Sequence, residues 1–199
     1  MSDTGAPWNL PYPLNTDLVR DGAEAIKDLA EATANGLNAA GGLVAVKSAI
    51  FTGTQTNSTA AGANFAVTDL TITHEVADPA NRLIISAFLG AAASSAGRGE
   101  VGIAIHDGTE LIAVGASPGN RTAVTAGGYV DQAGGAQVVA MPSVTFVHTP
   151  GSGSKTYTVR AVLIDTTTRT ISINRMDVDN DTSDRSRAVS SLVIQEVKV

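Results

Sequence analysis

Three histidines are the side chains best suited to acid–base or nucleophilic chemistry: His74, His106 and His148. A hydrolytic triad needs a nucleophile, a base and a group that orients the base. All three histidines lie inside or beside segments predicted to be strands, and His106 precedes a predicted turn at Asp107, which accounts for it without catalysis. No carboxylate pair stands out at a recognisable glycosidase site. The sequence therefore predicts no catalytic residue and no enzymatic activity.

The acidic segment 177–187 is the candidate for metal binding. Its aspartates alternate as they do at the start of a calcium-binding loop: Asp177, Asp179 and Asp181. An EF-hand loop also requires glycine at its sixth position and glutamate at its twelfth, where this chain has Thr182 and Ala188. A solvated acidic loop is therefore expected, with a shallower calcium site as the alternative. No metal and no other cofactor is predicted.

A long glycine-rich connection, residues 117–135, is the candidate binding loop. Long loops on a rigid β-scaffold are common positions for binding residues. This one carries side chains that can stack on a sugar or hydrogen-bond to it: Asn120, Arg121, Tyr129 and Asp131. Either the loop contacts a glycan or protein ligand, or it covers an axis of symmetry, or it is a variable turn.

Charge and composition exclude several kinds of partner. The formal net charge is −6, and the 13 lysines and arginines are scattered, whereas a nucleic-acid-binding protein needs them clustered. The chain has no cysteine, which excludes disulfides, thiolate zinc sites and cysteine nucleophiles. Residues 1–14 lack the pattern of a signal peptide, and no stretch approaches the ~20 apolar residues of a membrane span. We expect a soluble protein, made in a cytoplasm, that binds neither nucleic acid nor membranes.

Residues 1–14 form a proline-rich arm. Its prolines, at positions 7, 11 and 13, prevent a helix and hold the chain extended. Large apolar side chains alternate along it: Trp8, Leu10, Tyr12 and Leu14. Such residues either strap the arm to its own chain or anchor it in a pocket of another protein, and both interpretations are open.

A helix of ~20 residues is predicted within residues 15–40. Asn15 or Thr16 can cap its start, and Gly36 is a stop signal near its end. Small residues surround its predicted seam. The seam residues themselves recur at heptad spacing and are Val19, Ile26, Leu29 and Thr33. So thin a seam does not stabilise an isolated helix. We expect a trimeric coiled coil; the alternative is one helix lying against its own β-domain.

Residues 43–199 consist of short β-runs separated by turn residues. The apolar run 82–94 predicts a central strand buried on both faces, and the polar run 52–64 predicts a loop. Asp107-Gly108 predicts a tight hairpin, and Pro142 indicates an edge strand or a bulge. Roughly eight to ten such strands are typical of an antiparallel β-sandwich or jelly roll. The predicted fold is therefore mainly β, preceded by an extended arm and one helix.

The order of segments in the β-domain resembles that of phage tail-fibre and fibre-head domains. Residues 70–93 are similar to a Thr-rich strand and a strongly apolar strand that are frequent there. The resemblance continues through short motifs nearer the C-terminus: Tyr157-Thr158, Ile173-Asn174-Arg175, and Ser190-Ser191-Leu192 with Glu196. Residues 11–32 resemble the region that precedes the distal domain in small phage tail proteins. Together these segments cover most of the chain.

What the resemblance implies is a virion protein that is assembled in the cytoplasm of a bacterial host. In such families the β-domain is a trimeric jelly roll of the tumour-necrosis-factor-like kind. The resemblance thus implies a homotrimer. It would dock on other virion proteins through residues 1–14 and present its β-domain to a glycan or protein of the host surface. Because fibres of this kind are often much longer than 199 residues, a capsid decoration protein without a receptor is the alternative.

Overall fold

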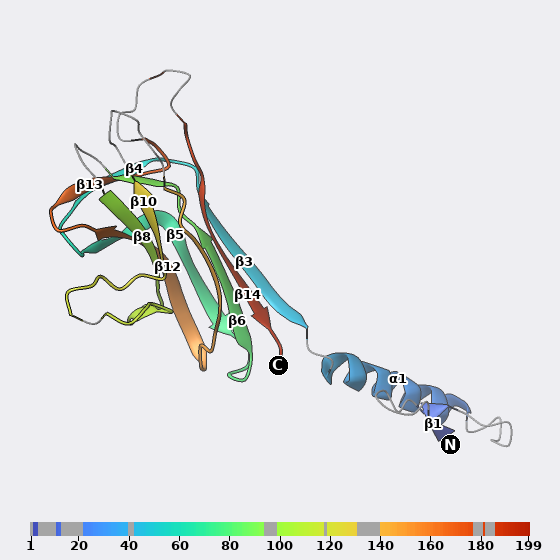
Figure 1. Cartoon of the computed structure of the whole chain (residues 1–199). Helices are drawn as coiled ribbons and strands as arrows, with labels where there is room; N and C mark the ends of the chain where they lie inside the picture. Colours follow the sequence, from blue (N-terminus) through green and yellow to red (C-terminus); the bar gives the residue numbers. More distant parts are fainter. Residues whose placement is uncertain are drawn as a thin grey trace. The chain divides into compact units, whose positions relative to one another are not determined.

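The structure is a computed structural model of the 199-residue chain. It describes residues 2–3, 11–12, 22–39, 42–93, 99–117, 119–130, 140–176, 181 and 186–199. The chain divides into two compact units, one within residues 1–42 and one spanning Leu43–Lys198 (Figure 1).

The N-terminal unit contains a short strand pair and one helix. Strand β1 (Ser2–Asp3) pairs antiparallel with β2 (Pro11–Tyr12). Helix α1 spans Gly22–Ala39, and β2 lies beside it. The predicted helix is confirmed over this range, whereas a coiled coil is not shown. Residues 13–21, where the helix was expected to begin, lie outside the described part.

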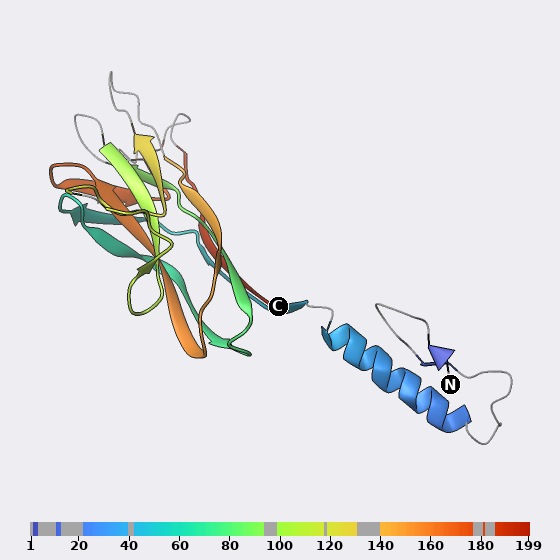
Figure 2. The same cartoon turned by 60° about the horizontal axis from the view of Figure 1, so that its bottom comes forward.

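The second unit is an antiparallel β-sandwich. Its strands are β3 Leu43–Phe51, β4 Gln55–Thr59, β5 Asn64–Val76, β6 Arg82–Phe88, β7 Ala91–Ala93, β8 Gly99–His106, β9 Leu111–Ile112, β10 Ala126–Val130, β11 Ser143–His148, β12 Gly153–Ile164, β13 Arg169–Ile173 and β14 Ser190–Val197. One layer has the order β10–β8–β12–β5 with β9 beside β8, and the other has the order β11–β6–β14–β3 (Figures 1 and 2). A third, small sheet has the order β4–β13–β7.

The hydrophobic core follows a period of two along β6, β14 and the second half of β5, whereas residues 101–105 of β8 are buried without interruption. Alternate residues point between the layers and are fully buried, among them Leu70, Leu83, Ile85, Ile103, Ile105, Leu163, Leu192 and Ile194. Burying one such side chain stabilises the fold by about 1.5–3 kcal/mol. The predicted β-sandwich is therefore confirmed.

Strand β6 lies centrally, between β11 and β14, as its apolar run predicted. The burial pattern of β6 nevertheless alternates between buried and half-buried residues. Ile84 and Phe88 point outward and are only half-buried. Among the described residues, full burial is therefore found on the inner face of β6 alone, and the prediction that both faces are buried is wrong for this part of the chain.

Two segments predicted as loops contain strands. Within 52–64, β4 pairs with β13, and within 117–135, β10 pairs with β8. Neither strand shows apolar alternation, because β4 is Gln-Thr-Asn-Ser-Thr and β10 carries Gly127-Gly128. Backbone pairing with distant partners, which needs no apolar side chains, determines both.

The predicted hairpin and edge strand are both present. After β8, Asp107 Oδ1 accepts the backbone N–H groups of Thr109 and Glu110 at 2.9 and 3.0 Å, and Gly108 has φ +96°. The hairpin loop is thus longer than two residues and is closed by the aspartate side chain. Pro142 directly precedes β11, which is an edge strand.

Asn174 joins four strand ends. Its side chain donates to the carbonyl oxygens of Phe51 (2.6 Å) and Gly53 (3.0 Å) and accepts the Ser190 hydroxyl (2.6 Å). The Ser190 oxygen in turn accepts the N–H of Gly90 at 3.0 Å. Asn174 is completely buried and has φ 58°, a conformation that asparagine tolerates better than most residues. The Asn174 and Ser190 motifs therefore have a structural role.

A second buried polar group lies near the end of β14. Glu196 Oε2 is 2.8 Å from His74 Nε2, and Glu196 Oε1 accepts the Asn81 amide (2.6 Å) and the Ala77 N–H (3.0 Å). Burial raises the pKa of the Glu196 carboxyl, but the hydrogen bonds from Asn81, His74 and Ala77 outweigh burial and hold that pKa below its usual range. This group ties the turn after β5 to the last strand.

Candidate functional site

A cleft of about 420 Å³ opens on the β-domain where β8 begins and β12 ends. One side is the connection between β9 and β10, and the other is the turn after β12. Two aliphatic residues, Val124 and Ile164, line the cleft together with acidic, basic and neutral polar ones. The polar residues are Glu100, Asn120, Arg121, Thr122, Asp165 and Thr166. In the register of β8 and β12, Glu100 lies opposite Ile164, so residues distant in sequence meet in this cleft.

Two glycines determine the shape of the cleft beside the sheet. Gly102 and Gly127 lie opposite each other in the β8–β10 pair. A Cβ atom on Gly102 would lie 2.6 Å from Val124 Cγ1, and one on Gly127 would lie 2.6 Å from Glu100 Oε1. Because these positions lack side chains, Val124 and the Glu100 carboxylate rest directly on the strand backbone.

Hydrogen bonds hold the connection between β9 and β10 against the sheet. Gly115 N–H donates to Val124 O (3.1 Å), and Thr125 N–H donates to Ile103 O of β8 (2.9 Å). The Ser117 hydroxyl donates to Arg121 O at 2.6 Å. The segment that carries Asn120 and Arg121 is thus tied to the strand that carries Glu100.

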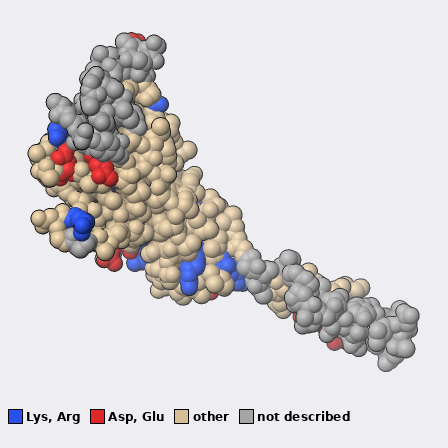
Figure 3. All heavy atoms as spheres, viewed as in Figure 1, with Lys and Arg blue, Asp and Glu red and all other residues tan. Residues whose placement is uncertain are grey.

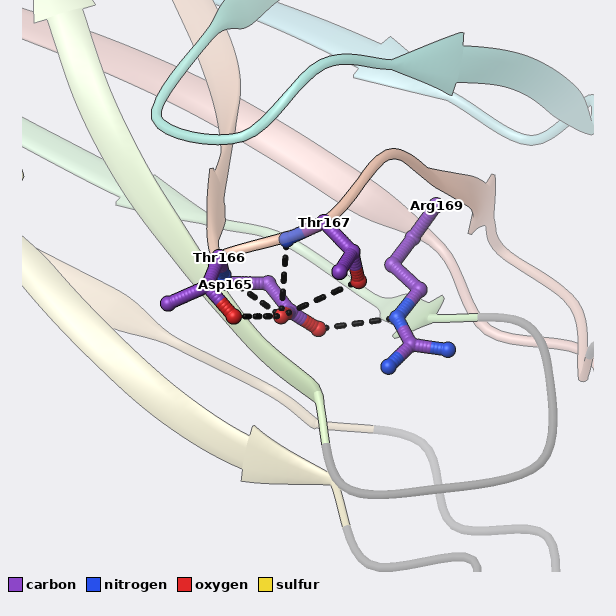
Figure 4. A network of polar contacts seen from close by, with 4 residues as sticks. All are labelled: Asp165, Thr166, Thr167 and Arg169. Atoms are coloured by element: carbon purple, nitrogen blue, oxygen red, sulfur yellow. Dashed lines mark hydrogen bonds and ion pairs between the residues drawn. The ribbon is translucent and has the colours of Figure 1, made fainter.

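Asp165 organises the opposite wall (Figure 4). Its Oδ1 accepts the N–H groups of Thr166 (2.5 Å) and Thr167 (3.1 Å), and its Oδ2 accepts Arg169 Nε at 2.8 Å. The bond from Arg169 is the main reason that the pKa of this carboxyl lies below its ordinary value; burial opposes the shift, and the two amides support it. Asp165 therefore stabilises the turn and presents Thr166 to the cleft.

The predicted binding-loop residues fall into three groups. Asn120 and Arg121 both line the cleft and are exposed. Tyr129 lies on strand β10 rather than on a loop, paired with Glu100, so its assignment to a loop is wrong. The side chain of Tyr129 and the whole of Asp131 lie outside the described residues.

Six cleft residues were not singled out from the sequence: Thr122 and Val124 lie within the predicted binding loop, and Glu100, Ile164, Asp165 and Thr166 lie outside it. Glu100 begins a strand that sequence patterns describe by its apolar positions, and Asp165-Thr166 reads only as a turn. An aspartate followed by two residues that can offer N–H groups, with arginine four positions on, was the available signal for a side-chain-closed turn.

None of the three histidine rings is hydrogen-bonded to a serine or threonine hydroxyl in the part of the chain described. His74 bonds to Glu196, and His106 Nδ1 accepts the N–H of Gly108 at 3.0 Å, in keeping with its predicted place at a turn. Residues 115–119 match the Gly-x-Ser-x-Gly spacing of a nucleophile elbow. That motif needs a strand, a sharp turn and a helix, whereas Ser117 lies in an exposed connection between β9 and β10.

A pair of aromatic rings, Tyr157 fully buried and His148 half-buried, lies beside the Asp107 turn. The rings of His148 and Tyr157 meet edge to face with centroids 5.9 Å apart, and neither His148 Nε2 nor the Tyr157 hydroxyl has a hydrogen-bond partner in the described structure. Burial, assisted by the charge of Asp107, raises the pKa of Tyr157 to about 12. Burial also lowers the pKa of His148, with Asp107 opposing that shift and Lys155 supporting it. At neutral pH the tyrosine is a hydrogen-bond donor and not a base.

The predicted attachment and seam residues are only partly described. Trp8, Leu10, Leu14 and Val19 lie outside the described residues, and Tyr12 is described only as part of the backbone of β2. On α1, Ile26 is 69% exposed and Leu29 is half-buried. Thr33 is half-buried and donates its hydroxyl to Leu29 O at 2.7 Å. Whether these residues form an interface stays a prediction.

A second surface is the outer face of the four-stranded sheet, which we call the uncharged face. Its residues form three rows across β11, β6, β14 and β3: Ser143, Phe88, Ser191 and Ile50; Thr145, Ser86, Val193 and Ser48; and Val147, Ile84, Gln195 and Val46. None of these twelve residues is charged; the nearest charged residue on the same face of β6 is Arg82, which lies beyond the three rows opposite Val197. Val46, Ile50 and Val147 are 52%, 60% and 67% exposed.

The outer face of the five-stranded sheet differs. It carries hydrogen-bonded threonine pairs (Thr71–Thr158 and Thr73–Thr156) together with charged residues: Glu75, Glu100 and Arg160. In the view of Figure 3, charged side chains of the β-domain gather at its left and lower margins, and a wide uncharged area lies between them.

Among the described residues, no cluster of histidine, aspartate and glutamate could hold a metal ion. Of the aspartates in the predicted acidic loop, Asp181 is described and exposed, and the others lie outside the described part. No helix in the described residues is long and apolar enough to cross a membrane.

Comparison with known proteins assigns no family. No model of a protein family matches the chain, and no curated protein sequence is detectably similar to it. Its function is therefore inferred from the surfaces of the β-domain and from the resemblance in segment order.

Proposed function

We propose that the protein is a non-enzymatic structural component of a phage virion. In this proposal it is a homotrimer, a tail fibre, tail tip or spike, that attaches through its N-terminal arm and presents its β-domain to the host surface. The observation that carries the proposal is the uncharged face, which a protein acting as a monomer has no need to keep free of charge.

The size and composition of the uncharged face favour contact with copies of the same chain. Four strands and three rows give an area on the order of 400 Å². Half of the twelve side chains are aliphatic or aromatic, and the rest are serine, threonine and glutamine. Exposed apolar side chains gathered on one face of a protein often mark an interaction site. A face without charge can meet a copy of itself without like-charge repulsion, which suits a closed symmetric assembly.

The trimeric jelly roll and the trimeric coiled coil are the two parts of the proposal that concern this assembly. A trimeric jelly roll would place the uncharged faces around the three-fold axis and leave the cleft on the other layer accessible. A trimeric coil of α1 would account for the exposure of Ile26 at a position of its predicted seam. Threefold symmetry itself comes from the resemblance and the heptad spacing.

Light scattering tests the assembly. We expect the protein to have a mass near three times the 20.2 kDa of one chain. Val46→Asp places a charge in the uncharged face, so this variant should dissociate at a higher protein concentration than the wild type. Thr73→Asp, on the exposed face of the other layer, is the matched control and should dissociate as the wild type does. A mass of one chain, or equal dissociation of both variants, would contradict the proposal.

Immunogold labelling tests the location, using particles from the lysate of cells that produce the protein. Label at the tail is expected. Label on the head would favour the alternative, a capsid decoration protein with the same trimer and no receptor. Particles without label would contradict both.

A further inference from the structure

The cleft beside β8 and β12 combines an apolar centre with a polar rim. Val124 and Ile164 supply the apolar part, and Thr122 and Thr166 bring hydroxyl groups to opposite sides of it. A volume of about 420 Å³ lies within the range of small-ligand sites. A ring with one C–H face and several hydroxyl groups around its edge matches this division between centre and rim.

The polar rim offers both donors and acceptors. The Asn120 amide can donate and accept, the Glu100 carboxylate accepts, and the threonine hydroxyls do both. Sugar hydroxyls also donate and accept, so each can be satisfied by such a rim. A ligand that carries negative charge and offers mainly acceptors, such as phosphate, is repelled by the Glu100 carboxylate.

The charges around the cleft are balanced. Arg121 is opposite in charge to Glu100, and Arg169 bonds to Asp165 at 2.8 Å. Both Asp165 oxygens already accept hydrogen bonds, one from its own turn and the other from Arg169. This carboxylate therefore stabilises the turn and does not act as a counter-ion for a ligand. Neither an anion nor a cation therefore gains a net electrostatic advantage over a neutral ligand.

The position of the Glu100 carboxylate depends on the absence of a side chain at Gly127. A Cβ atom at Gly127 would lie 2.6 Å from Glu100 Oε1, against the mobile end of that side chain, and Gly127 is not in a left-handed conformation. Alanine at this position can therefore move the carboxylate while leaving the strand in place. Gly127 thus borders the cleft through Glu100, and its missing side chain leaves room for this rim carboxylate.

We propose that this cleft binds a neutral pyranose sugar, with the ring on Val124 and Ile164 and its hydroxyl groups bonded to Glu100, Asn120 and the threonines. The inference rests on the proposed function, because it names the class of host-surface ligand that the β-domain would recognise.

Titration of the intact protein with single sugars, followed by amide NMR, tests this inference. The neutral probes are the methyl glycosides of glucose, galactose, mannose, rhamnose and N-acetylglucosamine; glucosamine and glucuronate are the charged ones. At least one neutral glycoside should bind with a Kd of about millimolar, shifting the amide signals of Gly127, Thr122 and Thr166. Absence of binding by every neutral glycoside, or binding of a charged sugar alone, would overturn the proposal.

Three variants locate the binding. Glu100→Gln and Gly127→Ala should each lower the affinity for the glycoside about tenfold, because both remove the charged acceptor from its position. Asn120→Ala should lower this affinity several-fold. Glu75→Gln, an exposed glutamate on the outer face of the same layer, should bind as the wild type does. Equal affinity of all four variants would overturn the assignment to this cleft.

The sugar titration and the tests of the proposed function can fail separately. If the glycoside fails to bind but the protein labels the tail and has the mass of a trimer, the inference about the cleft is wrong and the virion proposal stands. If the glycoside binds but particles carry no label, the cleft is a sugar site of a protein with another role.

Discussion

Asn174 shows at the scale of single residues how a short motif can be structural. The side chain uses both its amide hydrogens and its carbonyl oxygen, and its backbone N–H and C=O bond to Gly90 O and Ala188 N at 2.8 and 3.1 Å. Four segments separated in sequence therefore share one fully satisfied buried group. Such groups are costly to disrupt, since each unpaired partner keeps its desolvation penalty.

Asn174→Ala is expected to lower the free energy of unfolding by about 2–4 kcal/mol. It leaves the carbonyls of Phe51 and Gly53 and the Ser190 hydroxyl without this partner, and it places alanine at φ 58°. Urea unfolding measures the effect. Asn64→Ala, at an exposed position on β5, should change stability by no more than about 0.5 kcal/mol. Similar losses for the two variants would contradict the assigned role.

Glu196 is the second residue whose motif has a physical explanation. Its side chain is 1% exposed and bonded to three groups. Because its pKa is depressed in the folded state, the stabilisation it provides is fully present above the pKa of an unfolded glutamate, about 4.3, and is lost as pH falls through the folded pKa.

Glu196→Gln should therefore destabilise the protein most near neutral pH, and the difference from the wild type should narrow as pH falls from about 5 to 3. Urea unfolding at each pH gives the two curves. Asp107 and Asp165 also have lowered pKa values, so both proteins lose stability in acid and only the difference is diagnostic. Glu75→Gln is the exposed control and should follow the wild-type curve. A constant difference across this range would show that Glu196 ionisation is not the source of the stabilisation.

At the scale of elements, strand pairing overrides weak side-chain patterns. Strand β10 has two adjacent glycines yet pairs with β8 over five residue pairs. Its glycines permit Glu100 and Ala140 to approach the backbone closely, which larger residues would prevent. A glycine-rich run can therefore be an ordered edge strand, and here it forms part of the cleft.

Helix α1 carries a prediction of its own. Ile26→Asp together with Leu29→Asp should loosen the proposed trimer at its N-terminal end while the β-domain keeps its melting temperature, because the proposed seam has no partner for buried aspartates. Ala34→Asp with Asn35→Asp adds the same charge at exposed positions outside the predicted seam and is the control. Light scattering and thermal melting measure both variants. An Ile26/Leu29 variant with the mass and melting temperature of the wild type would exclude the helix from the interface.

At the scale of the whole molecule, we expect the arm to carry attachment to the particle. Prolines limit the chain entropy lost on docking, and aromatic anchors such as Trp8 and Tyr12 usually dominate such contacts, at about 2 kcal/mol or more each. Three arms per trimer would add to the avidity.

A chain that begins at Asp17 should therefore form trimers but fail to join particles that lack the native protein. Trp8→Ala with Tyr12→Ala should reduce incorporation in the same assay, and Thr4→Ala in the same arm is the control. Quantitative immunoblots of purified particles measure incorporation. Normal incorporation of the shortened chain would mean that the arm is an intramolecular strap, a role in keeping with the position of β2 beside α1.

The sequence by itself determined the division into a helix and a β-domain, the buried alternation of β5, the turn at Asp107 and the edge strand after Pro142. These features depend on local preferences, namely a period of two or 3.6, a side chain that closes its own turn, and a proline without an N–H group. Only the tertiary structure decided that β4 and β10 are strands, that Asn174 meets Ser190, and that Glu100 and Asn120 share a cleft with Asp165. Each of these depends on a partner far away in the chain, and a pairing partner leaves no local pattern in a segment of polar residues or glycines.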